Sequence, residues 1–263
     1  MAIKRIDKYV EYAITAFKQK INQKTYHYKN TDLKYMFFPN KESNNIVVVF
    51  SSFSRRGIPA RYNYLKTLKK YQTNKLFILD DFGIDKRGGY YLGAYPEFEF
   101  QQATINLISQ IITKSGVKKC IFCGTSKGGW ASLNIATYFA DIMQAVIIGA
   151  PQFMLGNWLN AEANSVVLEG IRNGNEKNEV IAILNQYLQD KMDKLQQHYP
   201  IYLHYSRNEH TYIDHIQYLI ADLKKHNWEY HIDEKEYTDH WDVSLYFPDF
   251  LKKSLDELGI NCK

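Results

Sequence analysis

A serine between two glycines has the surroundings in this chain that most clearly indicate chemistry. The stretch Gly124-Thr-Ser126-Lys-Gly128 has the spacing of a nucleophile elbow, in which the serine lies on a sharp turn between a strand and a helix. Such a turn strains the serine backbone, and the flanking glycines leave room for the neighbouring strand and helix. The alternative is an ordinary Gly-Ser loop, so the surrounding residues must decide between the two.

The neighbouring residues match the context that an elbow requires. Residues 118–123 form an apolar run typical of a buried strand, and residues 127–138 carry apolar side chains at helical spacing. A further apolar run at residues 145–151 predicts the next parallel strand. This order of strand, turn and helix favours a catalytic serine at position 126.

A serine hydroxyl becomes a good nucleophile when a base removes its proton and an acid orients that base. His240 follows the last predicted strand, and Glu209 follows the strand before it. The order Ser126, Glu209, His240 is the order of nucleophile, acid and base in an α/β-hydrolase. Three further carboxylates are close enough in sequence to replace the acid: Asp214, Asp239 and Asp242.

The reaction also requires N–H donors directed at the developing oxyanion. One predicted donor is the backbone N–H of Lys127, directly after the nucleophile. The second is expected from the loop that follows the predicted strand at residues 46–50. In that loop we favour the N–H of Phe53, with Ser52 as the next choice.

Four side chains near these positions are candidate substrate contacts. Arg55 and Arg56 are expected to bind a phosphate or carboxylate at the rim of the site, although paired loop arginines are often only solvated. His210 adjoins the predicted acid and is either a substrate contact or an exposed residue. Trp130 lies four residues after the serine and is the fourth candidate.

Strands and helices alternate along most of the chain. This succession predicts a mainly parallel sheet covered by helices on both faces, with a site at the carboxyl ends of the strands. An antiparallel hairpin at the start and the position of the serine strand match the α/β-hydrolase fold. The predicted strands are residues 25–28, 33–38, 46–50, 75–80, 118–123, 145–151, 199–205 and 228–233, and the predicted helices are residues 61–71, 97–115, 127–138 and 212–226.

Residues 152–198 interrupt this succession with two helical patterns, at residues 160–172 and 176–195. Two interpretations remain open. The segment is either a small helical cap over the serine or the set of crossover helices between two strands.

With 263 residues, 45% of them hydrophobic and 23% charged, the chain matches one α/β domain spanning residues 1–263. No apolar stretch approaches the roughly 20 residues that cross a bilayer, and the amino terminus lacks the core of a signal peptide. A cytoplasmic location is therefore expected. The amino terminus instead predicts an amphipathic helix through Ile3, Ile6, Val10, Ala13, Ile14, Phe17 and Ile21.

Charge and cysteine content restrict the partners. The net charge of +5 is spread along the chain, so nucleic-acid binding is not indicated, whereas an anionic polymer or a phosphate-bearing acyl donor is compatible. Cys120 and Cys123 resemble a zinc or redox pair by spacing. On a strand, however, residues three apart point to opposite faces, so we expect two buried structural thiols and no metal.

Several short motifs resemble those of the serine acyltransferases and hydrolases of bacterial capsule gene clusters, which include capsule polysaccharide O-acetyltransferases. They occur in the same order from about residue 46 to the carboxyl end. The motif that combines serine, lysine and two glycines is the most specific of them. The motifs are Phe50-Ser-Ser-Phe53, Arg61-Tyr-Asn-Tyr-Leu65, Gly89-Tyr-Tyr91, Gly124-Thr-Ser-Lys-Gly-Gly129 and Ala150-Pro-Gln152.

The resemblance implies an acetyl-serine intermediate at Ser126, acetyl-CoA as donor and a sugar hydroxyl of an anionic capsule polysaccharide as acceptor. It also supports Glu209 and His240 by position. The chain departs from the family pattern at both places, with Asn208-Glu209 in place of consecutive aspartates and Thr238-Asp-His240 in place of Gly-Gly-His. The acid can change from Asp to Glu without losing its role, whereas the substrate can change more freely.

The sequence therefore predicts an acyltransferase and leaves two alternatives. A carboxylesterase or polysaccharide deacetylase would use the same residues with water as acceptor. A non-catalytic accessory protein of a capsule synthesis complex would keep the fold without turnover.

Overall fold

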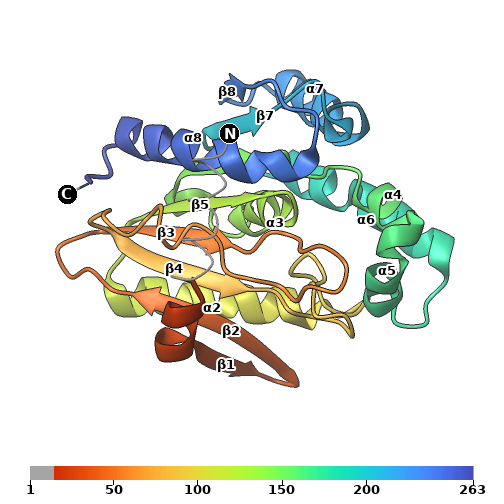
Figure 1. Ribbon diagram of the computed structural model, residues 1–263, viewed down its shortest axis with the longest axis horizontal. Helices are drawn as coiled ribbons and strands as arrows, with labels where there is room; N and C mark the ends of the chain where they lie inside the picture. The colour runs from red at the N-terminus through yellow and green to blue at the C-terminus, as the bar shows by residue number, and fades with distance from the viewer. Residues whose placement is uncertain (1–14, 263) are drawn as a thin grey trace.

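The computed structural model describes residues 15–262, and these confirm the predicted mainly parallel sheet (Figure 1). The described residues form an eight-stranded sheet in the order β1-β2-β4-β3-β5-β6-β7-β8. Strand β2 pairs antiparallel with β1 and β4, and the other pairs are parallel. The strands are β1 Lys24–Tyr28, β2 Thr31–Phe38, β3 Asn45–Phe50, β4 Asn74–Leu79, β5 Lys119–Thr125, β6 Met143–Gly149, β7 Ile201–Tyr205 and β8 Tyr230–Glu234.

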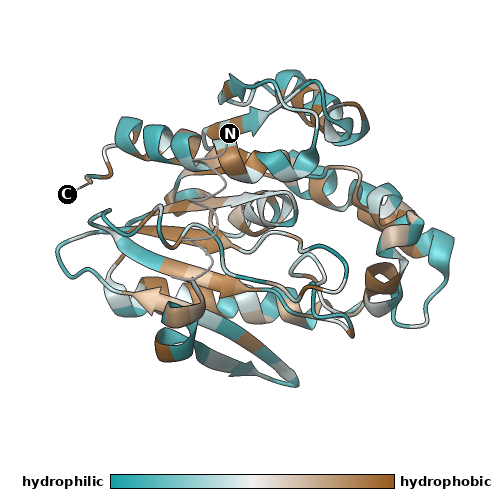
Figure 2. Ribbon diagram, viewed as in Figure 1, coloured by the Kyte–Doolittle hydropathy of each residue, from teal (hydrophilic) through white to brown (hydrophobic). Residues whose placement is uncertain are grey.

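The central strands are continuous apolar runs because both of their faces are covered. In β3, Val48 and Phe50 belong to the core on one face, whereas Val47 and Val49 belong to the core on the other. Figure 2 shows hydrophobic residues concentrated on these central strands, whereas β1 at the edge is mostly hydrophilic. The alternation of a strand thus supplies two cores from one short segment.

Cys120 and Cys123 on β5 lie in different cores, as their spacing on a strand predicts. Both thiols are free and buried. Burial raises the pKa of the Cys120 thiol to about 12 and that of Cys123 further still. Neither cysteine is therefore a reactive thiolate at neutral pH.

Helices cover both faces of the sheet. Helix α3 packs on β3, β5 and β6 from one side, and α8 packs on β5, β6 and β7 from the other. In Figure 1, α2 and α8 lie on opposite sides of the sheet. The helices are α2 Glu99–Ser115, α3 Lys127–Ala136, α4 Leu155–Asn160, α5 Ser165–Arg172, α6 Lys177–Asp193, α7 Gln217–Lys225 and α8 Val243–Glu257.

The predicted helix at residues 61–71 is wrong. Residues 61–64 are irregular and residues 65–70 form turns. Tyr64 has a positive φ of 62°, which breaks a right-handed helix, and its hydroxyl hydrogen-bonds Thr125 Oγ1 at 2.8 Å. The tertiary contacts of this segment therefore override its helical pattern.

The predicted amino-terminal amphipathic helix lies mostly outside the described residues. Its end is described, and residues 15–22 are helical. Phe17 and Ile21 are largely exposed on this helix. Within residues 15–262, no helix combines the length and the hydropathy that a bilayer-crossing segment requires.

Residues 152–198 contain α4, α5 and α6, which connect β6 to β7. Helix α6 contacts α3 and α4 and buries Leu184 and Leu188. No residue of 153–198 is among those that line the cavity at Ser126 described below. Helices α5 and α6 thus lie between β6 and β7 along the chain, and α4 places Trp158 against the ring of His210.

Lys191 fastens the carboxyl end of α6 to α3. Its Nζ donates to Asn134 Oδ1 and to the Tyr138 hydroxyl, both at 2.8 Å, and lies 4.2 Å from the centre of the Tyr187 ring. Burial lowers the pKa of Lys191 from its ordinary value of 10.5 to about 7.

This lowered pKa makes the stability of the protein depend on pH. Between pH 7 and pH 10.5 the unfolded chain holds a proton on Lys191 that the folded chain has released, so the free energy of unfolding rises with pH in this window. We expect Lys191→Met to remove this rise, which urea unfolding at pH 7, 8 and 9.5 would measure. Lys194→Met, at an exposed lysine after the same helix, should follow the wild type, and parallel curves for wild type and Lys191→Met would contradict the assignment.

Candidate active site

Ser126 occupies the strained turn that its motif predicts, between β5 and α3. Its φ of 51° and ψ of −119° lie outside the ordinary regions for a residue with a side chain. A Cβ at Gly124 would lie 2.6 Å from the backbone of Gly128, and one at Gly128 would lie 2.4 Å from the carbonyl oxygen of Phe50. Glycine is therefore required at both positions for strand, turn and helix to pack this closely.

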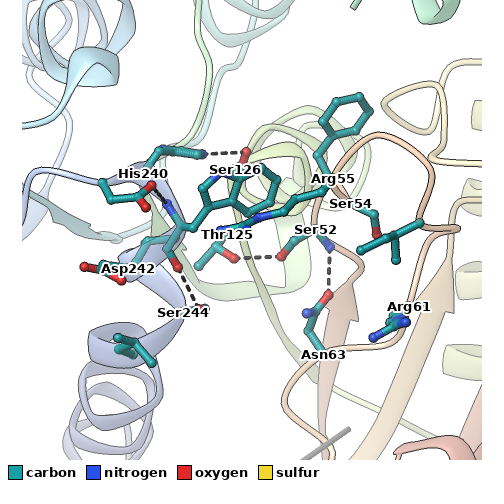
Figure 3. Close-up of a pocket in the computed structure, with 16 residues that line it drawn as sticks. Ser52, Ser54, Arg55, Arg61, Asn63, Thr125, Ser126, His240, Asp242 and Ser244 are labelled. Carbon is teal, nitrogen blue, oxygen red and sulfur yellow. Dashed lines mark hydrogen bonds between the residues drawn. The ribbon is translucent and has the colours of Figure 1, made fainter. Parts of the chain in front are cut away.

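The three residues predicted as nucleophile, base and acid lie in one hydrogen-bonded chain. His240 Nε2 is 3.0 Å from Ser126 Oγ, as Figure 3 shows, and His240 Nδ1 is 3.2 Å from Glu209 Oε2. An ionised carboxylate only accepts hydrogen bonds, so Nδ1 carries the proton and Nε2 is left to accept from the serine. This is the arrangement that general-base activation of a serine requires.

Glu209 is held in its ionised form although it is 2% exposed. Burial by itself raises its pKa, but hydrogen bonds from His240 and Thr211 and the charge of His240 outweigh burial, so the pKa lies below its usual value. The Thr211 hydroxyl and the Thr211 backbone N–H both donate to the carboxylate. A buried, ionised acid can orient His240 and stabilise its positive charge.

The alternative acids make other contacts. Asp214 lies 3.5 Å from His210, and Asp239 caps the short helix at His240–Asp242 by accepting from Trp241 N. Asp242 lines the cavity beside the serine. The carboxylate that meets His240 Nδ1 is that of Glu209.

The two donors predicted in the loop after β3 differ in their hydrogen bonds. The backbone N–H of Ser52 already donates to Asn63 Oδ1 at 2.8 Å, so Ser52 is not a free donor, contrary to the second-choice prediction. Within residues 15–262, the N–H groups of Phe53 and Lys127 donate to no other residue. Phe53 and Ser126 line the same cavity, and Lys127 begins α3, where the first N–H groups have no partner within a helix.

The side chain of Lys127 is fully buried in an ion pair that the sequence analysis missed. Its Nζ donates to Asp80 Oδ2 at 3.1 Å and to the carbonyl oxygens of Asp80 and Arg87 at 2.9 Å. Asp80 in turn accepts from the N–H groups of Gly89 and Tyr91. This ion pair joins the turn at Ser126 to the loop that follows β4.

We expect Lys127→Met to destabilise the protein by about 3–5 kcal/mol, because it leaves the Asp80 carboxylate buried without its cation. Chemical denaturation would measure this loss. Lys119→Met, at the exposed start of β5, is the matched control and should change stability by less than about 0.5 kcal/mol. A loss below about 1 kcal/mol for Lys127→Met would mean that the pair contributes little.

A cavity of about 580 Å³ opens beside Ser126 and His240 (Figure 3). Two arginines, Arg55 and Arg61, line it, and the Arg55 guanidinium lies 4.8 Å from the centre of the Trp241 ring. The sequence analysis predicted Arg55 here and missed Arg61 and Trp241. The sequence analysis placed Arg61 in the helix that was wrongly predicted at residues 61–71 and so did not consider it as a site residue.

Two of the predicted substrate contacts lie elsewhere. Trp130 is fully buried and packs against the rings of Tyr90 and Tyr187, so it is a core residue and the prediction is wrong. Arg56 is exposed and is not among the residues that line the cavity. His210 lies beside the site, with its ring centre 5.6 Å from that of His240.

Gln152 is a further side chain at the nucleophile to which the sequence analysis gave no role. It is fully buried, and its Nε2 donates to Ser126 Oγ at 3.2 Å. The Tyr90 hydroxyl donates to its Oε1 at 3.4 Å. Gln152 therefore contacts the serine oxygen although it is not among the residues that line the cavity.

Among residues 15–262, two groups of side chains have the donor types of a cation site. Glu209, His210 and His240 offer ligand atoms within 4.8 Å of one another, as do Asp193, Asp222 and His226. A cation in the first group would compete for the Nδ1 atom through which His240 meets Glu209.

No protein-family model and no curated protein sequence matches the chain. Solved structures do match it. The capsule O-acetyltransferase of Neisseria meningitidis serogroup A is 18% identical, with a TM-score of 0.73 over 88% of this chain and 94% of that one. The chain has the α/β-hydrolase fold. A mutant of the same acetyltransferase in complex with CoA is 16% identical, with a TM-score of 0.72 over 89% of this chain and 94% of that one.

Two other proteins share this α/β-hydrolase fold at similar levels of identity. The Gap123 glycosylation-associated complex of Streptococcus agalactiae is 16% identical, with a TM-score of 0.69 over 90% of this chain and 47% of that one. The fluorophosphonate-binding serine hydrolase FphF of Staphylococcus aureus is 13% identical, with a TM-score of 0.62 over 91% of this chain and 97% of that one. The structures therefore confirm the predicted resemblance at the level of the fold.

Proposed function

We propose that the protein is a serine O-acyltransferase that moves an acetyl group from acetyl-CoA to a hydroxyl of a capsular or other surface polysaccharide. The observation that carries this proposal is the chain from Ser126 Oγ through His240 to the buried Glu209, with distances of 3.0 and 3.2 Å. The fold shared with a capsule O-acetyltransferase supports the choice of substrates.

In the first half-reaction, Ser126 Oγ attacks the thioester carbonyl carbon while His240 Nε2 takes the hydroxyl proton. The N–H groups of Lys127 and Phe53 stabilise the oxyanion. The C–S bond then breaks, and Nε2 returns the proton to the sulfur, so that a free thiol leaves. Glu209 keeps Nδ1 protonated and stabilises the imidazolium.

In the second half-reaction, a sugar hydroxyl attacks the acetyl-serine carbonyl. His240 Nε2 takes the hydroxyl proton and gives it to Ser126 Oγ as the ester bond to the enzyme breaks. Transfer therefore consumes no net proton and regenerates the site.

Two arginines in the cavity, which Asp239 and Asp242 also line, support a donor that carries phosphate. Arg55 and Arg61 line the cavity that contains Ser126, and guanidinium groups bind phosphates well. A mutant of the meningococcal enzyme was solved in complex with CoA, which matches this choice of donor. The net charge of +5 matches an anionic polymer as acceptor, and we propose action in the cytoplasm, in association with a capsule synthesis complex.

A carboxylesterase or polysaccharide deacetylase is the second candidate. The same three side chains activate water as readily as a sugar hydroxyl, and FphF shares the fold. The third candidate is an accessory protein without turnover, for which the fold shared with the Gap123 complex is the supporting observation. The hydrogen bond between Ser126 and His240 favours the two enzymatic candidates over the third.

The first test is intact-protein mass spectrometry after brief exposure to acetyl-CoA. We expect an acetyl-sized gain in the wild type and none in Ser126→Ala, because the thioester is attacked by Ser126 Oγ. If the wild type gains no acetyl group but hydrolyses p-nitrophenyl acetate, the esterase candidate replaces the transferase. If it does neither, the accessory protein remains.

Substitutions of the proposed base and of the proposed acid should slow acetyl-enzyme formation to different extents. We expect His240→Ala to slow acetyl-enzyme formation by at least about 10³-fold, and Glu209→Gln by a smaller factor, because Glu209 acts through His240. Rapid-quench mass spectrometry would measure both rates. Glu236→Gln, at an exposed acid outside the cavity, is the matched control, and an unaffected rate in Glu209→Gln would remove Glu209 from the mechanism.

A further inference from the structure

His240 has an aromatic neighbour on each of two flanks. On one flank, the centre of the Trp241 ring lies 6.3 Å from that of His240. The Arg55 guanidinium packs over this Trp241 ring. On the other flank, His210 lies 5.6 Å from His240 between ring centres and stacks on Trp158 of α4. The two flanks differ in their side chains, and the cavity lies on the first of them, so they suit different ligands.

The flank of Trp241 forms the wall of the cavity, and two arginines and two aspartates are among the residues that line it. The loop after β3 and the segment from Asp239 to Leu245 enclose it, and Arg55 and Arg61 contribute its cations. Neither Trp158 nor His210 belongs to this lining. A long, phosphate-bearing donor matches this flank.

The flank of His210 is a stacked pair of aromatic rings that is partly exposed. The rings of Trp158 and His210 are nearly parallel, with an angle of 9° and a centre-to-centre distance of 5.8 Å. The His210 side chain is 50% exposed, and the Asp214 carboxylate lies 3.5 Å from its Nδ1. An aromatic surface beside a carboxylate is suited to a sugar ring, whose C–H groups pack on the rings while its hydroxyls donate to the acid.

We propose that the pair Trp158 and His210 binds the sugar ring of the acceptor, so that donor and acceptor reach His240 from opposite flanks. This inference rests on the proposed acyl transfer. A sugar on Trp158 and His210 would lie beside His240 and outside the cavity, because neither of these two residues lines the cavity. The leaving thiol therefore does not need to vacate the cavity before the acceptor binds.

Because the acceptor is unidentified, the probes are the methyl glycosides of glucose, N-acetylglucosamine and glucuronic acid. Saturation-transfer difference NMR on Ser126→Ala with saturating CoA measures sugar binding independently of turnover. We expect a signal from at least one glycoside, a loss of at least fivefold when Trp158→Ala is added, and partial recovery with Trp158→Phe. Tyr218→Ala, at an exposed aromatic residue on α7, is the matched control.

A second experiment measures the rate at which the acetyl-enzyme loses its acetyl group. We expect the binding glycoside to accelerate deacetylation of the wild type and to fail to do so in Trp158→Ala. Acetyl-enzyme formation from acetyl-CoA should remain within about twofold in Trp158→Ala and should fall in Trp241→Ala.

The two proposals fail in different ways. Absence of acetyl-enzyme in the wild type would overturn the acyl transfer. Three results would overturn the acceptor site on Trp158 and His210. The first is that no glycoside binds, and the second is that the glycoside competes with CoA. The third is that sugar binding survives Trp158→Ala and is lost in Trp241→Ala.

Discussion

The strained turn at Ser126 is the constraint on which the rest of the site depends. The turn brings β5, α3 and the end of β3 so close together that a Cβ at Gly124 or Gly128 would collide with backbone atoms. Strain of this kind persists only where the surrounding structure holds it. Ser126 N donates to Gly149 O on β6 at 2.8 Å, and its own carbonyl accepts from the first turn of α3. The turn is thus fixed from both of its ends.

Buried polar contacts attach the surrounding loops to this turn. Lys127 binds the loop after β4 through Asp80, and Thr125 binds the hydroxyls of Ser52 and Tyr64. Such contacts add little net stability as pairs but are costly to break, so they select one arrangement of the loops. The N–H of Phe53 and the arginines of the cavity gain their positions in this way.

Sequence reasoning predicted which residues meet where their positions follow from the order of elements along the chain. Ser126 lies on a turn that its glycines identify, and Glu209 and His240 follow the last two strands of a parallel sheet, whose ends meet at one edge. It failed where a pattern had two explanations. Trp130 has the spacing of a helix that could contact a substrate, yet the same spacing belongs to a core residue, and only the packing of Tyr90 and Tyr187 distinguishes them.

The sequence by itself determined the order of the strands, the turn at Ser126 and the chain order of Ser126, Glu209 and His240, because these depend on short-range patterns and on glycine positions. Only the tertiary structure decided which N–H groups are free, that Lys127 pairs with Asp80, and that Trp158 meets His210 beside His240. These pairs join residues far apart in sequence. Their formation depends on how whole helices and loops pack, and the pattern of neighbouring residues in the sequence does not predict that packing.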